Sequence, residues 1–359
     1  MTDRKPKTEL RKGWTTGACA TAAAFRALHS GTFLEAVQIT LPKGQTPTFK
    51  LERQELSPGR ALASVIKDAG DDPDVTHGAE IISEIHQTKT GSGVSFVAGA
   101  GVGTVTLPGL PLAVGEAAIN PAPRRMMETI IHDIAKELGV PGDVEVTISI
   151  TDGEKLALKT MNGRLGIKGG LSVLGTTGIV IPYSCSSWIH SIQRGVDVAK
   201  AAGISHIAAA TGSTSESAVA EHYGLADQAL IDMGDFAGGL LKYLRKQPIE
   251  RLTIAGGFGK LTKLAQGHLD LHSSRSALDL NDLAERARIG GADEVLWTKI
   301  RAANTGLEAL THCQNANIPI AHMIAVGARE VAMATLSGGI EIEVLVYDRQ
   351  GLLIGRCDE

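Results

Sequence analysis

Residues 205–214 read SHIAAATGST, residues 230–239 read LIDMGDFAGG and residues 251–260 read RLTIAGGFGK. Each segment begins with a short apolar run, passes through a glycine-containing turn and leads into a stretch with helical character. Strands that alternate with helices in this way are typical of βαβ units, whose strands lie parallel in one sheet. The sequence therefore predicts a C-terminal α/β domain with a parallel, Rossmann-like sheet.

The first part of the chain has a different rhythm. Residues 35–41 and 62–67 have the pattern of short strands, and a helix is expected over residues 125–138. Residues 144–150 (VEVTISI) alternate between apolar and polar side chains, which predicts a half-buried strand. We therefore expect a two-domain chain of α/β plus α+β class, with an α+β domain over residues 1–150 and the α/β domain over residues 151–359. The α/β domain is expected to end in a β-hairpin around the DRQG turn at 348–351.

Composition narrows the class of protein. A chain of 359 residues with 43% hydrophobic and 21% charged residues is typical of a soluble protein with two domains. The net charge of −4 does not favour non-specific nucleic-acid binding, and no apolar run approaches the roughly 20 residues of a membrane span. The four cysteines (Cys19, Cys185, Cys313 and Cys357) are dispersed, which predicts free thiols rather than disulfides or a zinc site. We expect a cytoplasmic protein without nucleic-acid or membrane partners, and a homo-oligomer is an open option.

Residues 11–24 read RKGWTTGACATAAA and predict a helix of small residues. Thr15 and Thr16 have N-cap chemistry, because a hydroxyl accepts from the free N–H groups of a first helical turn. Arg11 and Lys12 lie just before that turn, so its N–H groups are also suited to an anionic ligand. The alternative is a core helix with an ordinary cap.

The three strand-to-helix turns are candidate ligand sites, because open α/β sheets bind ligands beyond the carboxyl ends of their strands. Asp235 in the second turn has the chemistry to bind a ribose, although it also suits a helix N-cap. The candidates at the three turns are Thr211, Gly212, Ser213, Gly234, Asp235 and Gly256.

Residues 260–275 read KLTKLAQGHLDLHSSR and are rich in cationic side chains. Lys260 and Lys263 share one face if this segment is helical. His268 and His272 are four residues apart without a clear third ligand, so we predict no protein-bound metal. Such a cluster suits a polycarboxylate substrate, and a solvated basic surface is the alternative.

Two further segments carry candidate residues. Residues 115–127 read GEAAINPAPRRMM, in which Arg124 and Arg125 follow two prolines and have the chemistry to clamp carboxylates, or else begin a surface helix. Residues 163–184 are rich in glycine, which lets a backbone approach a ligand closely and also occurs in plain turns. This segment fits neither GxGxxG nor a P-loop, so no nicotinamide or nucleoside-triphosphate site is predicted.

Four of these strings occur in order and together resemble the cobalt-precorrin-5B C1-methyltransferase family: residues 11–24, 115–127, 169–184 and 259–274. The chain departs from the family pattern at Gly257 and Phe258, near which the family often has a histidine, and at Leu271, where threonine is common. The resemblance implies methyl transfer from S-adenosylmethionine to carbon 1 of cobalt-precorrin-5B, giving cobalt-precorrin-6A in anaerobic cobalamin biosynthesis. The cobalt then belongs to the tetrapyrrole substrate.

On this basis we assign hypothetical roles to the candidates. The strand-end residues are expected to bind S-adenosylmethionine, and the small-residue helix is expected to form a wall or floor for the tetrapyrrole. No general base is required if the ring supplies the electrons. A nucleotide- or phosphometabolite-binding transferase or oxidoreductase and a non-catalytic tetrapyrrole carrier are the alternatives. The expected substrate-binding residues are Thr15, Thr16, Arg124, Arg125, Lys260 and Lys263, and the catalytic candidates are His272, His268 and Glu116.

Overall fold

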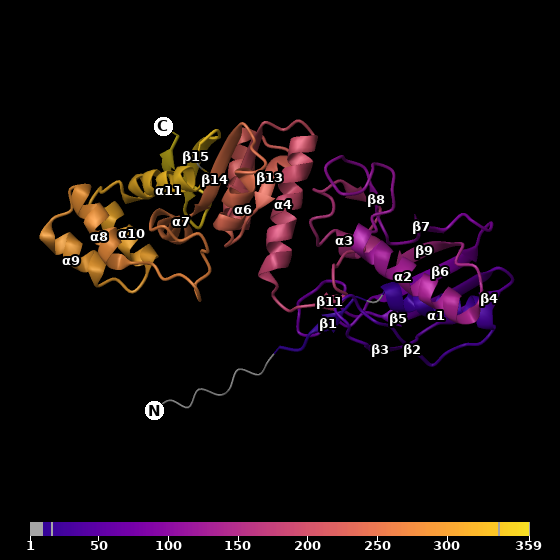
Figure 1. The fold of residues 1–359 in the computed structure, drawn as a ribbon. Helices are drawn as coiled ribbons and strands as arrows, with labels where there is room; N and C mark the ends of the chain where they lie inside the picture. The colour runs from indigo at the N-terminus through magenta and orange to yellow at the C-terminus, as the bar shows by residue number, and fades with distance from the viewer. Residues whose placement is uncertain (1–9, 16, 337, 359) are drawn as a thin grey trace, which may run out of the picture. The chain divides into compact units, whose positions relative to one another are not determined.

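The computed structural model describes residues 10–15, 17–336 and 338–358, and the chain has a mixed α/β fold (Figure 1). It divides into two compact units, which we call unit 1 (Met1–Ser184) and unit 2 (Cys185–Glu359). Among the described helices, none has both the length and the apolar character that a membrane crossing requires.

Unit 1 is built on a five-stranded sheet in the order β4-β5-β6-β9-β7, in which only β7 and β9 run parallel. The alternation at 144–150 does form a strand, β9, whose apolar residues are buried. The remaining elements are short strands and three helices. Unit 1 contains β1 (Gly13–Trp14), α1 (Gly17–Ser30), β2 (Ala36–Gln38), β3 (Thr48–Lys50), β4 (Gln54–Ser57), β5 (Arg60–Ile66), β6 (Glu80–Gln87), β7 (Val94–Ala98), β8 (Thr104–Val105), α2 (Pro121–Leu138), β9 (Val144–Ile150), α3 (Gly153–Ala157), β10 (Ile167–Lys168) and β11 (Ile179–Val180).

Helix α1 is the core helix of unit 1, not a wall open to a ligand. Its residues from Gly17 to Phe25 are all buried, and the helix packs against β5, β6 and α2. Small side chains let the helix axis approach the sheet closely, and Thr21 reaches across to Ser83 with a 3.0 Å hydroxyl contact. The expectation that this helix lines a tetrapyrrole site is therefore wrong for its buried length, because no face of it remains for a planar ligand to cover.

The division between the units falls later than the expected boundary at residue 150. Segment 151–184 pairs its strands with unit 1: β10 pairs with β8, and β11 pairs with β1. Leu171 donates its backbone N–H to Gly101 at 2.9 Å and is itself 4% exposed. The glycine-rich segment thus completes unit 1 instead of linking two domains.

Gly13 is required where the first strand passes the acidic turn. A Cβ at this position would lie 2.1 Å from the carbonyl carbon of Ala69, so no other residue fits without backbone movement. Gly70, with φ +67°, contacts Arg11 and Lys12 in the reciprocal direction. In the RKG part of the motif, Gly13 therefore allows the backbone of residues 11–13 to pass close to that of Ala69 and Gly70.

Unit 2 contains a five-stranded sheet in the order β13-β12-β14-β15-β16, with β16 antiparallel to its neighbour and the other strands parallel. Numbered by occurrence in the chain, this order is 2-1-3-4-5, one of the two common orders of doubly wound sheets. The predicted C-terminal hairpin is confirmed as β15 and β16. Unit 2 contains α4 (Cys185–Ala201), β12 (His206–Ala210), α5 (Ser213–Tyr223), a 3₁₀ turn (Asp227–Ala229), β13 (Leu230–Asp232), α6 (Ala237–Leu244), β14 (Arg251–Gly257), α7 (Phe258–Ala265), α8 (Leu280–Ile289), α9 (Glu294–Arg301), α10 (Gly306–Asn315), α11 (Ile320–Leu336), β15 (Glu341–Tyr347) and β16 (Leu353–Cys357).

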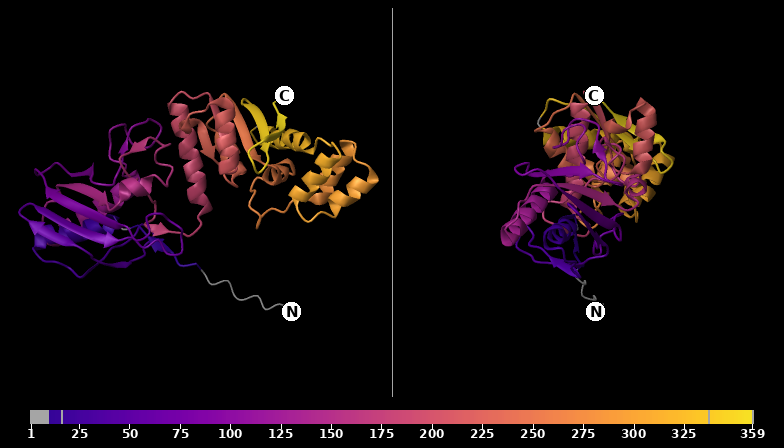
Figure 2. Two further views of the ribbon diagram at one scale, coloured as in Figure 1. Left: turned by 180° about the vertical axis from the view of Figure 1, so that it is seen from behind. Right: turned by 90° about the vertical axis from the view of Figure 1, so that its right-hand side faces the viewer.

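Helices cover both faces of this sheet. Helices α4, α6, α7 and α11 bury the larger apolar cluster on one face, and α5 packs on the other (Figures 1 and 2). The chain moves from β12 outward to β13, then crosses back to β14 on the other side of β12. The direction of winding therefore reverses between β12 and β14, and their carboxyl ends flank the point where such sheets bind ligands.

Replacing Gly13 by alanine should destabilise unit 1, because the added methyl group must displace the backbone of Ala69. We expect the free energy of unfolding to fall by about 1–3 kcal/mol, the usual cost of overpacking. Gly163→Ala is the matched control, since a Cβ there meets no atom within 4 Å. Urea unfolding monitored by fluorescence measures both changes, and equal stability of the two variants would contradict this interpretation.

Candidate functional site

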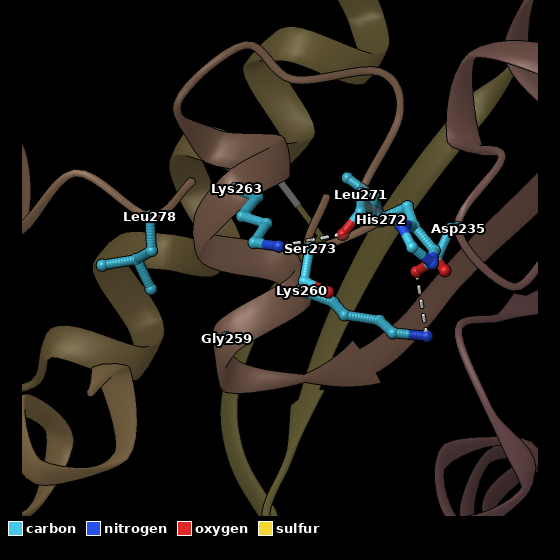
Figure 3. A pocket seen from close by; sticks show the side chains of 8 residues that line it. All are labelled: Asp235, Gly259, Lys260, Lys263, Leu271, His272, Ser273 and Leu278. Carbon is cyan, nitrogen blue, oxygen red and sulfur yellow. Dashed lines mark hydrogen bonds and ion pairs between the residues drawn. The ribbon is translucent and has the colours of Figure 1, made fainter. Parts of the chain in front are cut away.

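A pocket of about 400 Å³ opens beside the carboxyl ends of β12, β13 and β14. Its lining comes from the turn after β13, the first turns of α7 and the segment between α7 and α8 (Figure 3). Its volume lies within the range of about 300–1,000 Å³ that is usual for small-molecule sites. The lining residues are Asp235, Gly259, Lys260, Lys263, Leu271, His272, Ser273 and Leu278.

Lys260 connects the three strand ends at this pocket. Its Nζ donates to the carbonyl of Thr211 at 2.5 Å, just after β12, and lies 3.2 Å from Asp235 Oδ1, just after β13. Lys260 itself sits in the first turn of α7, which follows β14 directly. One ammonium group, on the helix that follows β14, therefore holds the loops after β12 and β13 across the point where the winding reverses.

Asp235 is the main acidic group of the pocket. Its side chain is 23% exposed, and Oδ1 is buried and accepts no hydrogen bond in the described structure, although Lys260 lies within ion-pair distance. Its backbone carbonyl accepts from the N–H of Leu271 at 2.8 Å, which fixes the loop. The carboxylate therefore has one oxygen buried against the Lys260 ammonium, while the side chain as a whole remains partly exposed on the pocket wall. Asp235 lies ahead of α6, whose N-cap is Phe236, so the N-cap alternative for Asp235 does not hold.

The segment after α7 carries His272 along the pocket wall. Nδ1 of His272 accepts from the Ser274 backbone N–H at 3.2 Å and lies 2.7 Å from the Ser274 hydroxyl. Because Nδ1 accepts, the neutral ring carries its proton on Nε2. Lys263 donates to the carbonyl of Leu271 at 3.0 Å, so it supports this segment as well as lining the pocket. Lys260 and Lys263 both lie in α7, so the condition for their sharing one helical face is met.

His268 and His272 both lie outside helices, so their spacing does not place them on one helical face. His268 does not line the pocket, and Asp270 between them forms an ion pair with Arg275 at 2.9 Å. Among the described residues, no group of three or more His, Cys, Asp or Glu side chains is arranged to hold a metal ion.

The glycines at the strand ends differ in their surroundings. Gly212 has no atom within 4 Å of an added Cβ, so the backbone before α5 is open to a ligand. Gly256 is closely packed, with a Cβ position 2.8 Å from Thr211 Oγ1. Gly234, with φ +53°, packs against the indole of Trp188. Ser213 is the first residue of α5 and is exposed.

Glu116 and Arg124 lie together in unit 1 and bind each other. Arg124 donates to Glu116 at 2.9 Å and also to the carbonyls of Ile119 and Ala117, at 2.7 and 3.1 Å. These bonds fix the loop that precedes α2. The Arg124 guanidinium thus holds the backbone of its own unit.

Arg125 differs from its neighbour. It is exposed, and in the described part of the chain its guanidinium has no recorded ion pair. It lines a smaller hollow of about 180 Å³ with Pro42, Met126 and Thr176, among others. Thr15 is half-buried and donates its backbone N–H to Gly178 at 2.8 Å, whereas Thr16 lies outside the described residues.

Arg11 is not free to attract an anion to α1. Its guanidinium binds both oxygens of Asp68, at 2.5 and 2.8 Å. This bidentate bond, helped by the N–H of Gly70, lowers the pKa of Asp68 to about 2. The basic pair at the start of the motif therefore serves the acidic turn at 68–74.

Comparison with known proteins identifies the family. The model for CbiD matches residues 3–182, and the model for the CbiD C-terminal domain matches residues 270–358. A Brucella anthropi protein named cobalt-precorrin-5B C(1)-methyltransferase is 57% identical over 354 residues, covering 98% of this chain and 96% of that protein. The chain belongs to the CbiD family. The family resemblance inferred from four short strings is confirmed.

A second named relative and a solved structure are also similar to this chain. A Brucella melitensis biotype 2 protein, also named cobalt-precorrin-5B C(1)-methyltransferase, is 57% identical over 355 residues, 98% of this chain and 96% of that protein. A crystal structure described as cobalamin biosynthesis protein (cbiD) from Archaeoglobus fulgidus is 30% identical, with a TM-score of 0.40, over 74% of this chain and 83% of that chain.

Sequence reasoning missed some of the surroundings of the pocket in this CbiD chain. Leu278 lines it from beyond the predicted segment, and no periodicity in the sequence marks that position. Beside Asp235, Arg275 lies 5.8 Å from the ring centroid of Phe236 and donates to Cys185 Sγ at 3.2 Å. Trp188 donates to the carbonyl of Asp232 at 3.2 Å. Helix α4 supplies two of these groups, which lie far in the sequence from the strand-end turns.

Arg124→Lys should destabilise unit 1 of the CbiD chain, because one ammonium cannot replace three hydrogen bonds in a fixed fork. We expect a loss of about 1–3 kcal/mol in the free energy of unfolding. Glu116→Gln should cost less than about 1 kcal/mol, because the carboxylate is 43% exposed. Chemical denaturation tests this order, and the reverse order would show that the Arg124 bonds do not hold the loop.

The Arg11–Asp68 pair should make stability depend on pH at the acid end. The folded pKa of Asp68, about 2, lies below its ordinary value, so the pair stabilises the fold fully above about pH 4 and its contribution is lost as pH falls from 4 towards 2. Asp68→Asn should remove that part of the acid dependence and leave the slope above about pH 5 unchanged. The effect is expected to be small, because both groups are about half exposed. Urea unfolding across this pH range is the measurement, and an unchanged acid slope would count against the pair.

Proposed function

We propose that this protein is an S-adenosylmethionine-dependent methyltransferase that methylates carbon 1 of cobalt-precorrin-5B in cobalamin biosynthesis. The observation that carries the proposal is 57% identity, over nearly the whole chain, to proteins named cobalt-precorrin-5B C(1)-methyltransferase. The two family models match residues 3–182 and 270–358, so each unit of the chain contains a matched segment.

The pocket of unit 2 is the proposed site of the methyl donor. Its place at the reversal of strand order is where doubly wound, Rossmann-type sheets bind nucleotides. Its residues fit such a group: a buried carboxylate oxygen of Asp235 without a hydrogen bond, a nearby ammonium of Lys260, and open backbone at Gly212. When bound, the donor supplies a methyl group whose bond to the sulfonium breaks as the ring's electrons form the new bond to carbon 1.

The chain's own contribution to such a reaction is positioning, because a direct displacement gains most from correct orientation of its two reactants. Lys260 and Asp235 fix the donor's polar groups. Ser213 and Gly256 remain predictions, because neither is among the residues that line the pocket. His272, with its proton on Nε2, is suited to donate a hydrogen bond and not to remove a proton. His268, which does not line the pocket, and Glu116, which belongs to unit 1, remain predictions.

The substrate carries carboxylate side chains, and Arg125 is the proposed residue for one of them. Its guanidinium is exposed and lines a hollow with Thr176, whereas Arg124 and Lys263 bind backbone carbonyls. Thr15 remains a candidate in the same unit. The cytoplasmic location and the absence of a protein-bound metal stay predictions, and a homo-oligomer stays an open option.

The test has two arms. Calorimetry with S-adenosylhomocysteine should show binding to the wild-type protein, and mass spectrometry should show a methylated product from cobalt-precorrin-5B and S-adenosylmethionine. A tetrapyrrole carrier would bind the corrinoid without consuming the donor. No product with both substrates present would overturn the proposal.

A pair of neighbouring glycines tests the location of the donor. Gly256→Ala places a methyl group 2.8 Å from Thr211 Oγ1 and 2.9 Å from Leu261, so Thr211, whose carbonyl Lys260 binds, or Leu261 must move. We expect it to weaken S-adenosylhomocysteine binding about tenfold or more, which corresponds to about 1.4 kcal/mol. Gly257→Ala is the control, since an added Cβ meets nothing within 4 Å. Equal affinities in both variants would place the donor elsewhere.

A further inference from the structure

The charges of the Asp235–Lys260 pair indicate which end of the donor the pair binds. The two charged groups lie 3.2 Å apart on the wall of the 400 Å³ pocket; Lys260 reaches it from the first turn of α7 and Asp235 from the turn after β13 (Figure 3). Lys260 is 40% exposed and Asp235 is 23% exposed, so both are accessible to a ligand and partly shielded from water. A charged side chain that is partly shielded from water attracts an oppositely charged ligand group more strongly than a charged side chain at an open surface does.

Both members of the pair have unused hydrogen-bonding capacity. The Lys260 ammonium has three donors, and the structure records bonds to Thr211 and an ion-pair contact with Asp235. Asp235 Oδ1 accepts no hydrogen bond in the described structure and is buried. The pair can therefore open towards a ligand without breaking the bond from Lys260 to Thr211.

Charge balance limits what that ligand can be. A simple anion would take Lys260 and leave the Asp235 carboxylate unpaired, and a simple cation would leave Lys260 unpaired. Leaving one partly buried charge without a partner is costly. A zwitterion with an ammonium and a carboxylate on the same carbon satisfies both groups at once. An α-amino acid group has this structure.

The beginning of α5 adds to this match. Helix α5 (Ser213–Tyr223) has no side-chain cap, and Gly212 before it has open space on its Cα. The carbonyl of Thr211, which Lys260 binds, lies directly before this turn. Free N–H groups at a helix start favour a carboxylate, so the carboxylate of the ligand would be held from two sides.

Building on the proposed function, we infer that Asp235 and Lys260 recognise the amino-acid end of S-adenosylmethionine: Lys260 binds its α-carboxylate and Asp235 its α-ammonium. This differs from the sequence-based hypotheses, in which Asp235 binds the ribose and Lys260 binds the tetrapyrrole. The pair thereby favours donors and products that carry an α-amino acid group over nucleosides that lack this group.

The experiment compares two ligands on the full-length protein. S-adenosylhomocysteine has the amino-acid group, whereas 5′-methylthioadenosine has the same adenine and ribose without it. Lys260→Met and Asp235→Asn should each weaken S-adenosylhomocysteine binding by roughly 10- to 100-fold, as expected for a charge-assisted hydrogen bond. Binding of 5′-methylthioadenosine should change less than about threefold in either variant. Lys242→Met, an exposed lysine of α6, is the matched control and should change neither affinity.

The outcomes separate this inference from the proposal beneath it. Equal weakening of both ligands by Asp235→Asn would assign Asp235 to the ribose and overturn the inference, while leaving the donor pocket in place. Unchanged binding of both ligands in both variants would also overturn it. Failure of the wild-type protein to bind either ligand would overturn the donor pocket itself. Asp235→Asn is isosteric and remains decisive if Lys260→Met does not fold, which circular dichroism would show.

Discussion

The ammonium group of Lys260 is the contact on which the candidate site depends. Sheet topology brings the carboxyl ends of β12, β13 and β14 to one edge, but it does not fix the loops that follow them. The bond from Lys260 to Thr211 and the ion pair to Asp235 do so, from the first turn of the next helix. Because the reversal of winding lies between β12 and β14, this lysine occupies the place where an α/β sheet of this order binds its ligand.

Local pattern predicted much of unit 2, because β12, β13 and β14 are short apolar runs that lead into glycine-containing turns. The strands at β12, β13 and β14 and the C-terminal hairpin lie where the sequence placed them. Two helix starts lie earlier than the sequence predicts: α5 begins at Ser213, where the pattern predicts a start near Glu216, and α11 begins at Ile320, where it predicts a start near Gly327. The first turn of α5 reads STSE, and such small and polar residues have a weak helical signal, so tertiary packing decides its structure.

The candidate residues differ in whether they already bind other residues of the chain. The sequence alone does not show these partners. Arg11 and Arg124 looked like ligands for anions, yet each is paired with an acid of its own chain, Asp68 and Glu116. Those partners lie 57 and 8 residues away in the sequence, in loops whose approach depends on the folded backbone. Arg125 lies next to Arg124 but lines the hollow of about 180 Å³ instead of pairing with an acid among the residues that the structure describes. Adjacent identical residues can thus have opposite roles.

The small-residue motif illustrates how burial decides between two uses of one sequence. A stretch such as GACATAAA allows a helix to approach either a ligand or a sheet, because both need a surface without bulky side chains. In α1 the sheet takes that surface, since residues from Gly17 to Phe25 are buried and Thr21 contacts Ser83 on β6. The same constraint explains the glycines around it: Gly13 and Gly70 permit a backbone crossing, and the glycine-rich segment up to β11 closes over the start of the motif by pairing with β1. A motif that identifies the family can therefore owe its composition to packing, while the residues proposed for the chemistry, Asp235, Lys260 and His272, lie elsewhere in the chain.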